Sequence, residues 1–371
     1  MKKKCLIISY YMYPPENTPR AFHTEGMIKE FQNAGYEVDV IIPETNFEYK
    51  EKNIHTVRPY FRNKPKYSMN VQQKYDNNQK RSILSIIKSK VASFIYYFIW
   101  PDKTLPYSYF AYKKAKQLNK QYDVLFTITG PYSPFLAGYF LKKNNYAKKW
   151  IVDYGDPFSG LEHGDTRFYD AFLEKKLLSI ADFVTIPTEI AKKSYLHLVN
   201  EDKIIILPQQ FQWNPIKSDY KIDPSKINLL YAGKMYHKRP PDDLVTFLIN
   251  NNSEDVVLHM FGDTDYFKEF FKDHTKNTPF KGQIIYNGFI DRALLLDIYT
   301  KMDYLINIEW PTSNQKPSKL IDYNISNRPI INLPQDVNVK VEKQEEFKEI
   351  NLSYLNKNRK YAIDFINRLE S

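Results

Sequence analysis

Short apolar runs alternate along this chain with segments of helical pattern, and this alternation limits the fold more than any other feature. The first apolar run, Cys5–Ser9, is followed by a Pro-Pro turn and by a stripe at helical spacing that comprises Met27, Ile28, Phe31 and Ala34. Gly35 is expected to end that helix. Strands that alternate with helices form parallel βα units. The pattern therefore predicts an α/β protein with doubly wound parallel sheets.

The alternation occurs in two stretches, which suits a chain of 371 residues, too long for one small core. In the first stretch the predicted strands are Cys5–Ser9, Val38–Ile42, Val124–Ile128, Trp150–Val152, Phe183–Ile186 and Ile204–Leu207. In the second they are Leu229–Tyr231, Val256–Phe261, Ile284–Tyr286, Tyr304–Ile308 and Pro329–Leu333. We predict an N-terminal domain (1–210), a linker (211–226), a second domain (227–341) and a helical tail (342–371) packed back toward the first domain. Two such domains would face each other across a cleft at the carboxyl ends of their strands.

Composition and charge limit the class of protein. No run approaches about 18 uninterrupted apolar residues, so no membrane-spanning helix is expected. The start of the chain is too short in apolar residues for a signal peptide, and the single Cys5 allows neither an internal disulfide nor a cysteine-built zinc site. These features favour a cytoplasmic protein. The net charge of +10 suits an anionic partner, which can be nucleic acid, an acidic membrane surface or a phosphorylated substrate. No nucleic-acid-binding motif supports the first option.

One segment departs from the βα order. Residues 60–90 are polar and rich in Lys and Asn, and residues 91–100 are apolar and aromatic. A basic stretch that leads into an aromatic helix is what a membrane-surface anchor requires. The alternative is an ordinary core helix after a solvated loop, and it is the more frequent case.

The stretch Gln315–Tyr323 has the layout of a phosphate and ribose site. It places Ser318 and Lys319 at a turn, Asp322 one helical turn later, and an apolar strand after that. Backbone N–H groups at a helix start and an ammonium group can bind a diphosphate, and a carboxylate further along can accept hydrogen bonds from sugar hydroxyls. Taken alone, the segment can equally be a surface loop with a capped helix.

The remaining motifs argue against several other functions. Asp263 and Asp265 have the spacing with which some sugar transferases bind a divalent ion, but we interpret Gly262–Asp265 as a turn after a strand. No Gly-x-Gly-x-x-Gly, Walker or Gly-x-Ser-x-Gly motif occurs, and the histidines are scattered. No metal and no cofactor are expected.

Five stretches in the expected order resemble bacterial two-domain (GT-B) glycosyltransferases of the large retaining glycosyltransferase family four. They are Ser9–Arg20 with the helix after it, Trp150–Ser159 with Ile180–Ile186, Tyr231–Arg239, and Pro317–Tyr323. The resemblance implies the GT-B fold: two facing Rossmann-like domains with a cleft between them.

For the second domain, the resemblance implies a donor site. Gly233 with Lys234 and Arg239 would neutralise the donor diphosphate, together with Ser318 and Lys319. Asp322 takes the place of the glutamate that binds the ribose, and Asn314 that of an earlier glutamate near the sugar. The nucleotide base would rest on Phe289 and Ile290, which follow Gly288.

For the first domain, the resemblance implies an acceptor side. Asn17 and Thr18 with Arg20 replace a Gly-Gly loop, so that Arg20 can supply a cation near the donor sugar or acceptor. Gly155 occupies the position of a common catalytic histidine, and Asp156 after it is the proposed acceptor-side acid or base, with Asp153 in a structural role. His23 and His163 are possible substitutes for the missing histidine.

The resulting functional hypothesis is transfer of a sugar from a nucleotide-diphosphate sugar to a glycan acceptor, with retained configuration and without a metal. The variant motif around Asp156 resembles a subgroup that builds surface polysaccharides (capsule or O-antigen), so a lipid-linked acceptor and a peripheral position at the inner membrane face are expected. Two alternatives stay open. A nucleotide-sugar epimerase of related fold would turn over the donor without an acceptor, and a non-catalytic protein would bind anionic membrane through its basic surface.

Overall fold

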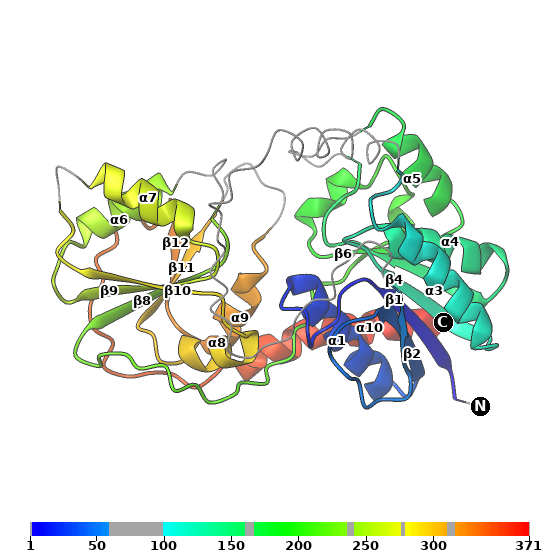
Figure 1. Cartoon of the computed structure of the whole chain (residues 1–371), viewed down its shortest axis with the longest axis horizontal. Helices are drawn as coiled ribbons and strands as arrows, with labels where there is room; N and C mark the ends of the chain where they lie inside the picture. Colours follow the sequence, from blue (N-terminus) through cyan, green and yellow to red (C-terminus); the bar gives the residue numbers. More distant parts are fainter. Residues whose placement is uncertain are drawn as a thin grey trace. The chain divides into compact units, whose positions relative to one another are not determined.

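The computed structural model describes residues 2–58, 99–159, 167–235, 241–275, 279–309 and 316–370. The described residues form two compact units. Unit 1 contains the chain up to residue 212 together with residues 357–370, and unit 2 contains residues 213–356 (Figure 1). Each unit is built around one parallel β-sheet.

Unit 1 has a seven-stranded sheet in the order β3-β2-β1-β4-β5-β6-β7. Its strands are β1 (Lys4–Ser9), β2 (Glu37–Pro43), β3 (Ile54–Val57), β4 (Tyr122–Ile128), β5 (Ala147–Asp153), β6 (Phe183–Ile186) and β7 (Ile204–Ile206). Every neighbouring pair is parallel. In a parallel sheet covered on both faces the strands are continuous apolar runs, as in Leu6-Ile7-Ile8, which is at most 1% exposed.

Helices cover both faces of this sheet. The helices are α1 (Pro19–Asn33), α3 (Leu105–Gln117), α4 (Ser133–Lys143), α5 (Asp170–Leu178) and α10 (Leu352–Glu370), with two short 3₁₀ helices at Ile190–Ser194 and Glu201–Lys203. Residues of α3, α4 and α5 pack into the core on one face. On the other face α1 packs with the C-terminal part of α10, whose Phe365 contacts the rings of Phe31 and Phe126.

Helix α1 shows how the sequence sets an element. Thr18 caps it by accepting a hydrogen bond from the Ala21 N–H through Oγ1 (3.3 Å). Gly35 follows the helix with a φ of +86°, which is the left-handed conformation predicted for its end. Met27, Ile28 and Phe31 are buried as expected, but Ala34 is exposed, because it is already the C-cap residue.

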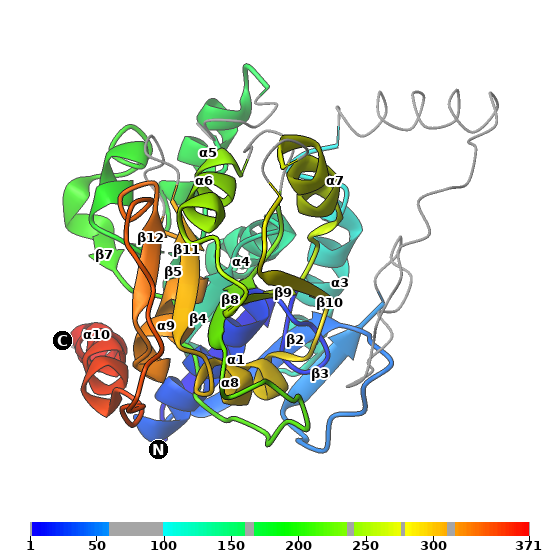
Figure 2. The ribbon, with the colours of Figure 1, turned by 90° about the vertical axis from the view of Figure 1, so that its left-hand side faces the viewer.

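Unit 2 has a five-stranded parallel sheet in the order β10-β9-β8-β11-β12, seen from the side of this unit in Figure 2. The strands are β8 (Ile227–Ala232), β9 (Val256–Phe261), β10 (Gln283–Gly288), β11 (Tyr304–Ile308) and β12 (Ile330–Leu333). Its helices are α6 (Asp242–Asn250), α7 (Asp265–His274), α8 (Arg292–Tyr299) and α9 (Lys319–Ser326). Helices α6 and α7 cover one face, and α8 and α9 cover the other.

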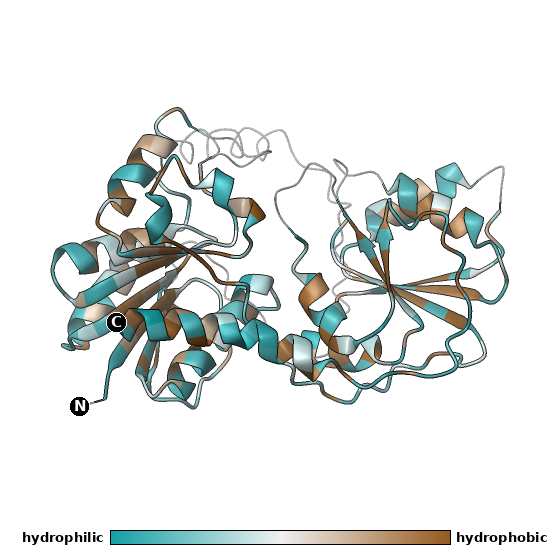
Figure 3. Ribbon diagram, turned by 180° about the vertical axis from the view of Figure 1, so that it is seen from behind, coloured by the Kyte–Doolittle hydropathy of each residue, from teal (hydrophilic) through white to brown (hydrophobic). Residues whose placement is uncertain are grey.

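The hydropathy pattern follows this layering: apolar colour concentrates on the strands of both sheets, and the outward faces of the helices are polar (Figure 3). All eleven strands predicted from apolar runs are present within three residues of their expected bounds. Strand β3 was missed, because Ile54-His-Thr-Val57 is short, polar in its middle and only partly buried.

Two segments differ from the prediction: the start of the C-terminal tail and the segment expected to be a linker. The tail was expected to be helical from residue 342, but the helix begins at Leu352. Residues 342–351 are irregular. Residues 213–226 belong to unit 2, where the Ile216 N–H donates to the Ala293 carbonyl (2.8 Å) and Trp213 and Tyr220 pack against its core.

Candidate functional site

Both sheets have a point where the strand order reverses, and loops at the carboxyl ends of the strands on either side of that point form binding sites in this class of fold. In unit 1 the reversal lies between β1 and β4, and in unit 2 it lies between β8 and β11. Most predicted site residues follow these strands or lie near them.

The group in unit 1 centres on Arg20, in the first turn of α1. Its Nε donates to the Thr129 carbonyl directly after β4 (2.9 Å), and its Nη2 donates to the Asp153 carbonyl at the end of β5 (3.2 Å). The same Nη2 contacts the Asp153 carboxylate in an ion pair. The pair is buried, with 12% of the Arg20 side chain and 1% of the Asp153 side chain exposed. Arg20 thus connects the ends of three elements at the switch point.

Asp153 also contacts two further side chains. Thr185 on β6 donates to its Oδ1 (2.7 Å), and His23 Nε2 lies 3.2 Å from its Oδ2. The Gln210 N–H donates to His23 Nδ1 (2.9 Å), so the neutral imidazole carries its proton on Nε2, facing the carboxylate. Burial alone would raise the pKa of Asp153, but the charge of Arg20 and the contact with His23 hold it at about 2. Burial lowers the pKa of His23, although Asp153 opposes this shift.

Asp156 lies on the loop after β5 and is exposed. The surrounding protein raises the pKa of its carboxyl by desolvation, and the Arg20 charge opposes that effect. Because the residue contacts water, solvent screening limits both influences. Asn17 is likewise exposed, on the loop before Thr18. Of the predicted residues in unit 1, the structure therefore pairs Arg20 with Asp153 rather than with Asp156.

The loop that carries Asp156, residues 154–159, is fixed at both ends by Glu174 on α5. Glu174 Oε1 accepts from the Tyr154 hydroxyl (2.7 Å), and Oε2 accepts from the Ser159 N–H (3.0 Å) and from the Ser159 hydroxyl. In the middle of the loop the Tyr132 hydroxyl donates to the carbonyls of Asp156 (3.0 Å) and Pro157 (3.2 Å). Burial raises the pKa of Glu174, which is fully buried. The arrangement presents Asp156 to solvent from an anchored backbone.

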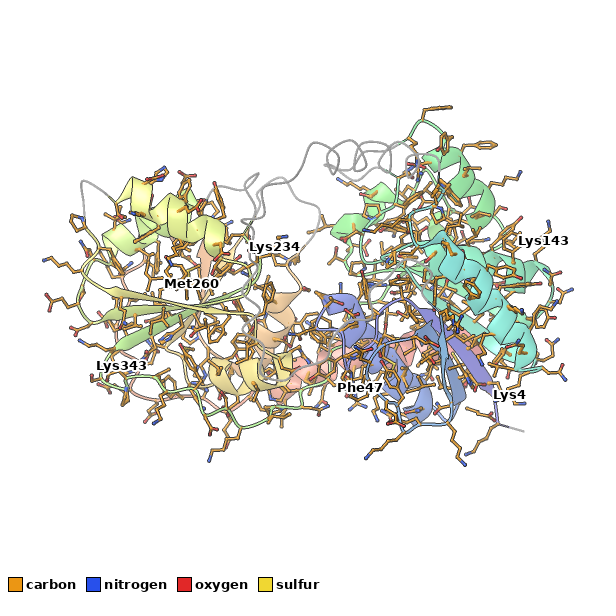
Figure 4. The ribbon with its side chains drawn as sticks, in the orientation of Figure 1. Lys4, Phe47, Lys143, Lys234, Met260 and Lys343 are labelled. Carbon is orange, nitrogen blue, oxygen red and sulfur yellow. The ribbon has the colours of Figure 1, made fainter. Side chains whose placement is uncertain are left out.

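The group in unit 2 begins where β8 ends. Gly233 has a φ of +147°. A Cβ on Gly262, in the loop after β9, would stand 2.2 Å from the carbonyl oxygen of Gly233, so the two backbones approach closely. Lys234 extends from this loop (Figure 4) and is half-exposed. Its Nζ lies 3.5 Å from Asp263 Oδ2. Asp263 and Asp265, the pair with metal-site spacing, lie after β9 and in the first turn of α7.

Lys319 is the first residue of α9, directly after Ser318. Its Nζ lies 4.0 Å from the ring centroid of Tyr231 on β8 and 3.4 Å from the Ile306 carbonyl on β11. No carboxylate forms an ion pair with it among the residues that the structure describes. Burial lowers the pKa of Lys319 to about 7, although part of its side chain still contacts solvent. At the switch point of unit 2, this amino group therefore has no anionic partner among the described residues.

Asp322, the predicted ribose ligand, lies one turn further along α9 and is 5% exposed. Arg292 on α8 binds it in a bidentate pair, with Nε donating to Oδ2 (2.9 Å) and Nη2 donating to Oδ1 (2.5 Å). Phe289, the predicted base contact, follows β10 and is 44% exposed, whereas Ile290 is partly buried against the core.

Some predictions fall outside the described residues. They are Arg239, Asn314, His163 and the basic aromatic segment apart from its last two residues, Ile99 and Trp100. Conversely, four residues of these groups were not predicted from the sequence: Glu174, Arg292, Tyr132 and Tyr231. Each acts through a contact with a residue distant in sequence, which the local sequence pattern does not reveal.

Two further properties concern the described part of the chain. No helix there is long and apolar enough to cross a membrane. In the same ranges no group of three or more His, Cys, Asp or Glu side chains gathers in a way that could hold a metal ion.

Comparison with known proteins places the fold. No protein-family model matches the sequence, and no curated protein matches it. Solved structures do match. The catalytic domain of starch synthase IV from Arabidopsis thaliana, bound to ADP and acarbose, is 11% identical with a TM-score of 0.57, over 100% of this chain and 93% of that one. HepE from Anabaena, with UDP and glucose, is 10% identical with a TM-score of 0.55, over 98% and 90%. The pneumococcal O-GlcNAc transferase GtfA, with UDP and GlcNAc, is 11% identical with a TM-score of 0.54, over 100% and 93%.

These likenesses define the class of fold. The protein has the GT-B architecture of two parallel Rossmann-like sheets, here of seven and five strands. The predicted fold class is therefore confirmed. At 10–11% identity the likeness extends to the fold alone.

Proposed function

We propose that this protein is a glycosyltransferase that moves a sugar from a nucleotide-diphosphate sugar to a glycan acceptor. The transfer would retain the anomeric configuration, would need no metal, and would serve the synthesis of a bacterial surface polysaccharide. The donor would bind to unit 2, and groups on unit 1 would act on the acceptor side.

Lys319 is the observation that carries this proposal. A lysine whose pKa is lowered to about 7, over an aromatic ring and without a carboxylate partner in the described ranges, is stabilised by the arrival of an anion. It lies at the start of α9, where backbone N–H groups also favour negative charge. Structures of the same fold hold UDP or ADP, so a nucleoside diphosphate is the anion we infer.

The other donor contacts follow from position. Lys234, with the close backbone turn at Gly233, would contribute a second cation, and Arg239 and Ser318 would add donors for the diphosphate. Asp322 would accept from the ribose hydroxyls, with Arg292 fixing the orientation of its carboxylate. The exposed ring of Phe289 and the neighbouring Ile290 would carry the base. Negative charge that develops on the leaving diphosphate would be stabilised by these fixed cations.

On the acceptor side, Asp156 would act as the acid or base, and Arg20, with Asn17, Thr18 and Asn314, would contact the donor sugar or the acceptor. In a retaining route the leaving phosphate can itself take the acceptor's proton, so a strong base is not required. The acceptor would be lipid-linked, which places the protein at the inner face of the plasma membrane.

The test is a thermal-shift titration with UDP, GDP, ADP, TDP and CMP sugars, followed by an assay of nucleotide release with and without glycan acceptors. One nucleotide class should raise the melting temperature of the wild type and of the control Lys272→Ala, but not of Lys319→Ala or Lys234→Ala. Asp322→Asn should reduce the preference for ribose over 2′-deoxyribose nucleotides. Donor turnover in the absence of any acceptor would instead indicate an epimerase, and failure of every nucleotide to stabilise the wild type would overturn the donor site.

A further inference from the structure

The surface of α5 carries the most exposed aromatic side chains of the described chain. Phe168, just before the helix, is 94% exposed, and Phe172, one turn later, is 69% exposed. Lys175 and Lys176 continue the same surface by one more turn and are also exposed. We call these four residues the α5 surface. Single exposed apolar residues are common on protein surfaces, but two phenylalanines on successive turns form an apolar patch, and such patches mark interaction sites.

The charges of α5 are sorted between its two faces. Its acids point inward: Asp170 binds Arg167 (2.9 Å), and Glu174 binds Tyr154 and Ser159. The outward lysines, in contrast, make no ion pair within the described ranges. The outer face is therefore aromatic at one end and cationic at the other, with no exposed carboxylate of its own helix to neutralise it.

Residues 99–101, which follow the basic and aromatic stretch of the sequence, lie beside this surface. Arg167 donates through Nη1 to the Ile99 carbonyl (2.9 Å) and through Nη2 to the Pro101 carbonyl (2.7 Å). Trp100 also contacts Phe158 with ring centroids 5.8 Å apart. Arg167, the residue immediately before Phe168, thus fixes residues 99–101 next to the α5 surface.

We infer that the α5 surface binds an anionic lipid bilayer. Phenylalanine rings can enter the boundary between headgroups and acyl chains, and lysines one turn away can meet lipid phosphates without leaving the interface. A polar protein partner would leave both rings in contact with polar groups, and a purely apolar partner would leave both lysines unpaired. The boundary of an anionic bilayer offers apolar chains and phosphate groups at nearly the same depth, which suits both parts. This inference rests on the membrane position of the proposed function and deepens it by naming the surface that binds. Vesicle binding is measured without any reaction, so its failure is distinguishable from failure of sugar transfer.

The test uses the full-length protein and co-sedimentation with phosphatidylcholine vesicles, with and without about 30% phosphatidylglycerol. The wild type should bind only the anionic vesicles, and raising the salt concentration should weaken that binding. Phe168→Ala/Phe172→Ala and Lys175→Gln/Lys176→Gln should each reduce the affinity by about tenfold or more. The matched controls lie on α3 of the same unit: Tyr109→Ala, which removes a ring that is 62% exposed, and Lys113→Gln/Lys116→Gln should bind like the wild type.

A site-specific label separates the bilayer from other occupants. Cys5 is the one cysteine of the chain and is fully buried, so Phe172→Cys can be labelled selectively with an environment-sensitive fluorophore. Its emission should shift to the blue on addition of anionic vesicles but not neutral ones, and a label at Tyr109→Cys should not respond. A label already shielded before vesicles are added would show that the chain itself or a second copy covers the surface. That result, or equal loss of binding in the α3 controls, would overturn the inference.

Discussion

Arg20 occupies the space that a side chain at Gly155 would need. A Cβ at Gly155 would stand 3.0 Å from Arg20 Cδ and 3.2 Å from its Nη1, tighter than ordinary van der Waals contact. In the family that the sequence resembles, a histidine often takes this position. In this structure the side chain of Arg20 leaves no room for a histidine at position 155.

We expect the two positions to be coupled in stability. Gly155→His should destabilise the protein by about 1–3 kcal/mol, because the imidazole must displace the buried guanidinium. In an Arg20→Ala background the same change should cost much less, since the space is then empty. Chemical denaturation of the four proteins gives the coupling energy, and strictly additive effects would contradict the packing relationship.

The buried pair of Arg20 and Asp153 should dominate the acid sensitivity of unit 1. The folded pKa of Asp153, about 2, lies below its unfolded value, so the pair contributes stability above the unfolded pKa that is lost as the pH falls through about 2. Arg20→Ala should cost about 3–5 kcal/mol at neutral pH, because an uncompensated carboxylate stays buried. The loss should shrink as the pH is lowered.

A surface ion pair in the same unit serves as the control. Lys148→Ala removes a pair with Asp123 in which the lysine side chain is 76% exposed, and should cost less than about 1 kcal/mol at every pH. Urea titrations of the three proteins between pH 2 and pH 7 check both expectations. An Arg20 variant as mildly affected as the Lys148 variant would show that the buried pair adds nothing.

Nucleotide binding at Lys319 should depend on pH above neutrality. Without bound nucleotide, Lys319 has a pKa of about 7. A bound diphosphate would favour the charged form of the lysine and raise its pKa. Affinity should therefore be constant below about pH 7 and fall as the pH rises, with uptake of protons on binding. Lys319→Arg keeps its charge, so its affinity should stay flat over this range. Calorimetric titration in two buffers of different ionisation enthalpy measures the proton uptake, and equal profiles for the two proteins would refute the role of the lysine.

Glu174 should act on transfer through Asp156. Glu174→Ala leaves the Ser159 N–H and the Tyr154 hydroxyl unpaired, so the loop loosens and kcat should fall by about tenfold or more, with donor affinity unchanged. Glu174→Gln can still accept from Ser159 and donate to Tyr154, and should retain most activity. In an Asp156→Ala background, Glu174→Ala should cause little further loss. An equal loss in both backgrounds would mean that Glu174 only stabilises the fold.

Much of the fold could be predicted from the sequence, and much of the site could not. The strands were predictable because a buried parallel strand is a continuous apolar run, readable in the sequence itself. The turn at Gly35 and the cap at Thr18 are equally local. By contrast, nothing near Asp153 in the sequence indicates its ion pair with Arg20, which is separated from it by 133 residues.

The same distinction separates the candidate residues of unit 2. Ser318, Lys319 and Asp322 were recognisable as a group because they share one turn and one helix, and local spacing decides their proximity. What each can offer a ligand depended on contacts from other elements: Arg292 on α8 orients the Asp322 carboxylate, while the contacts of Lys319 with described residues are to a carbonyl and to aromatic rings. The sequence by itself determined the α/β layers and the places where chemistry can occur, since propensity and periodicity are local. The tertiary structure decided which charges are neutralised and which are left for a partner, because charge pairing depends on distances in space that the order of residues does not contain.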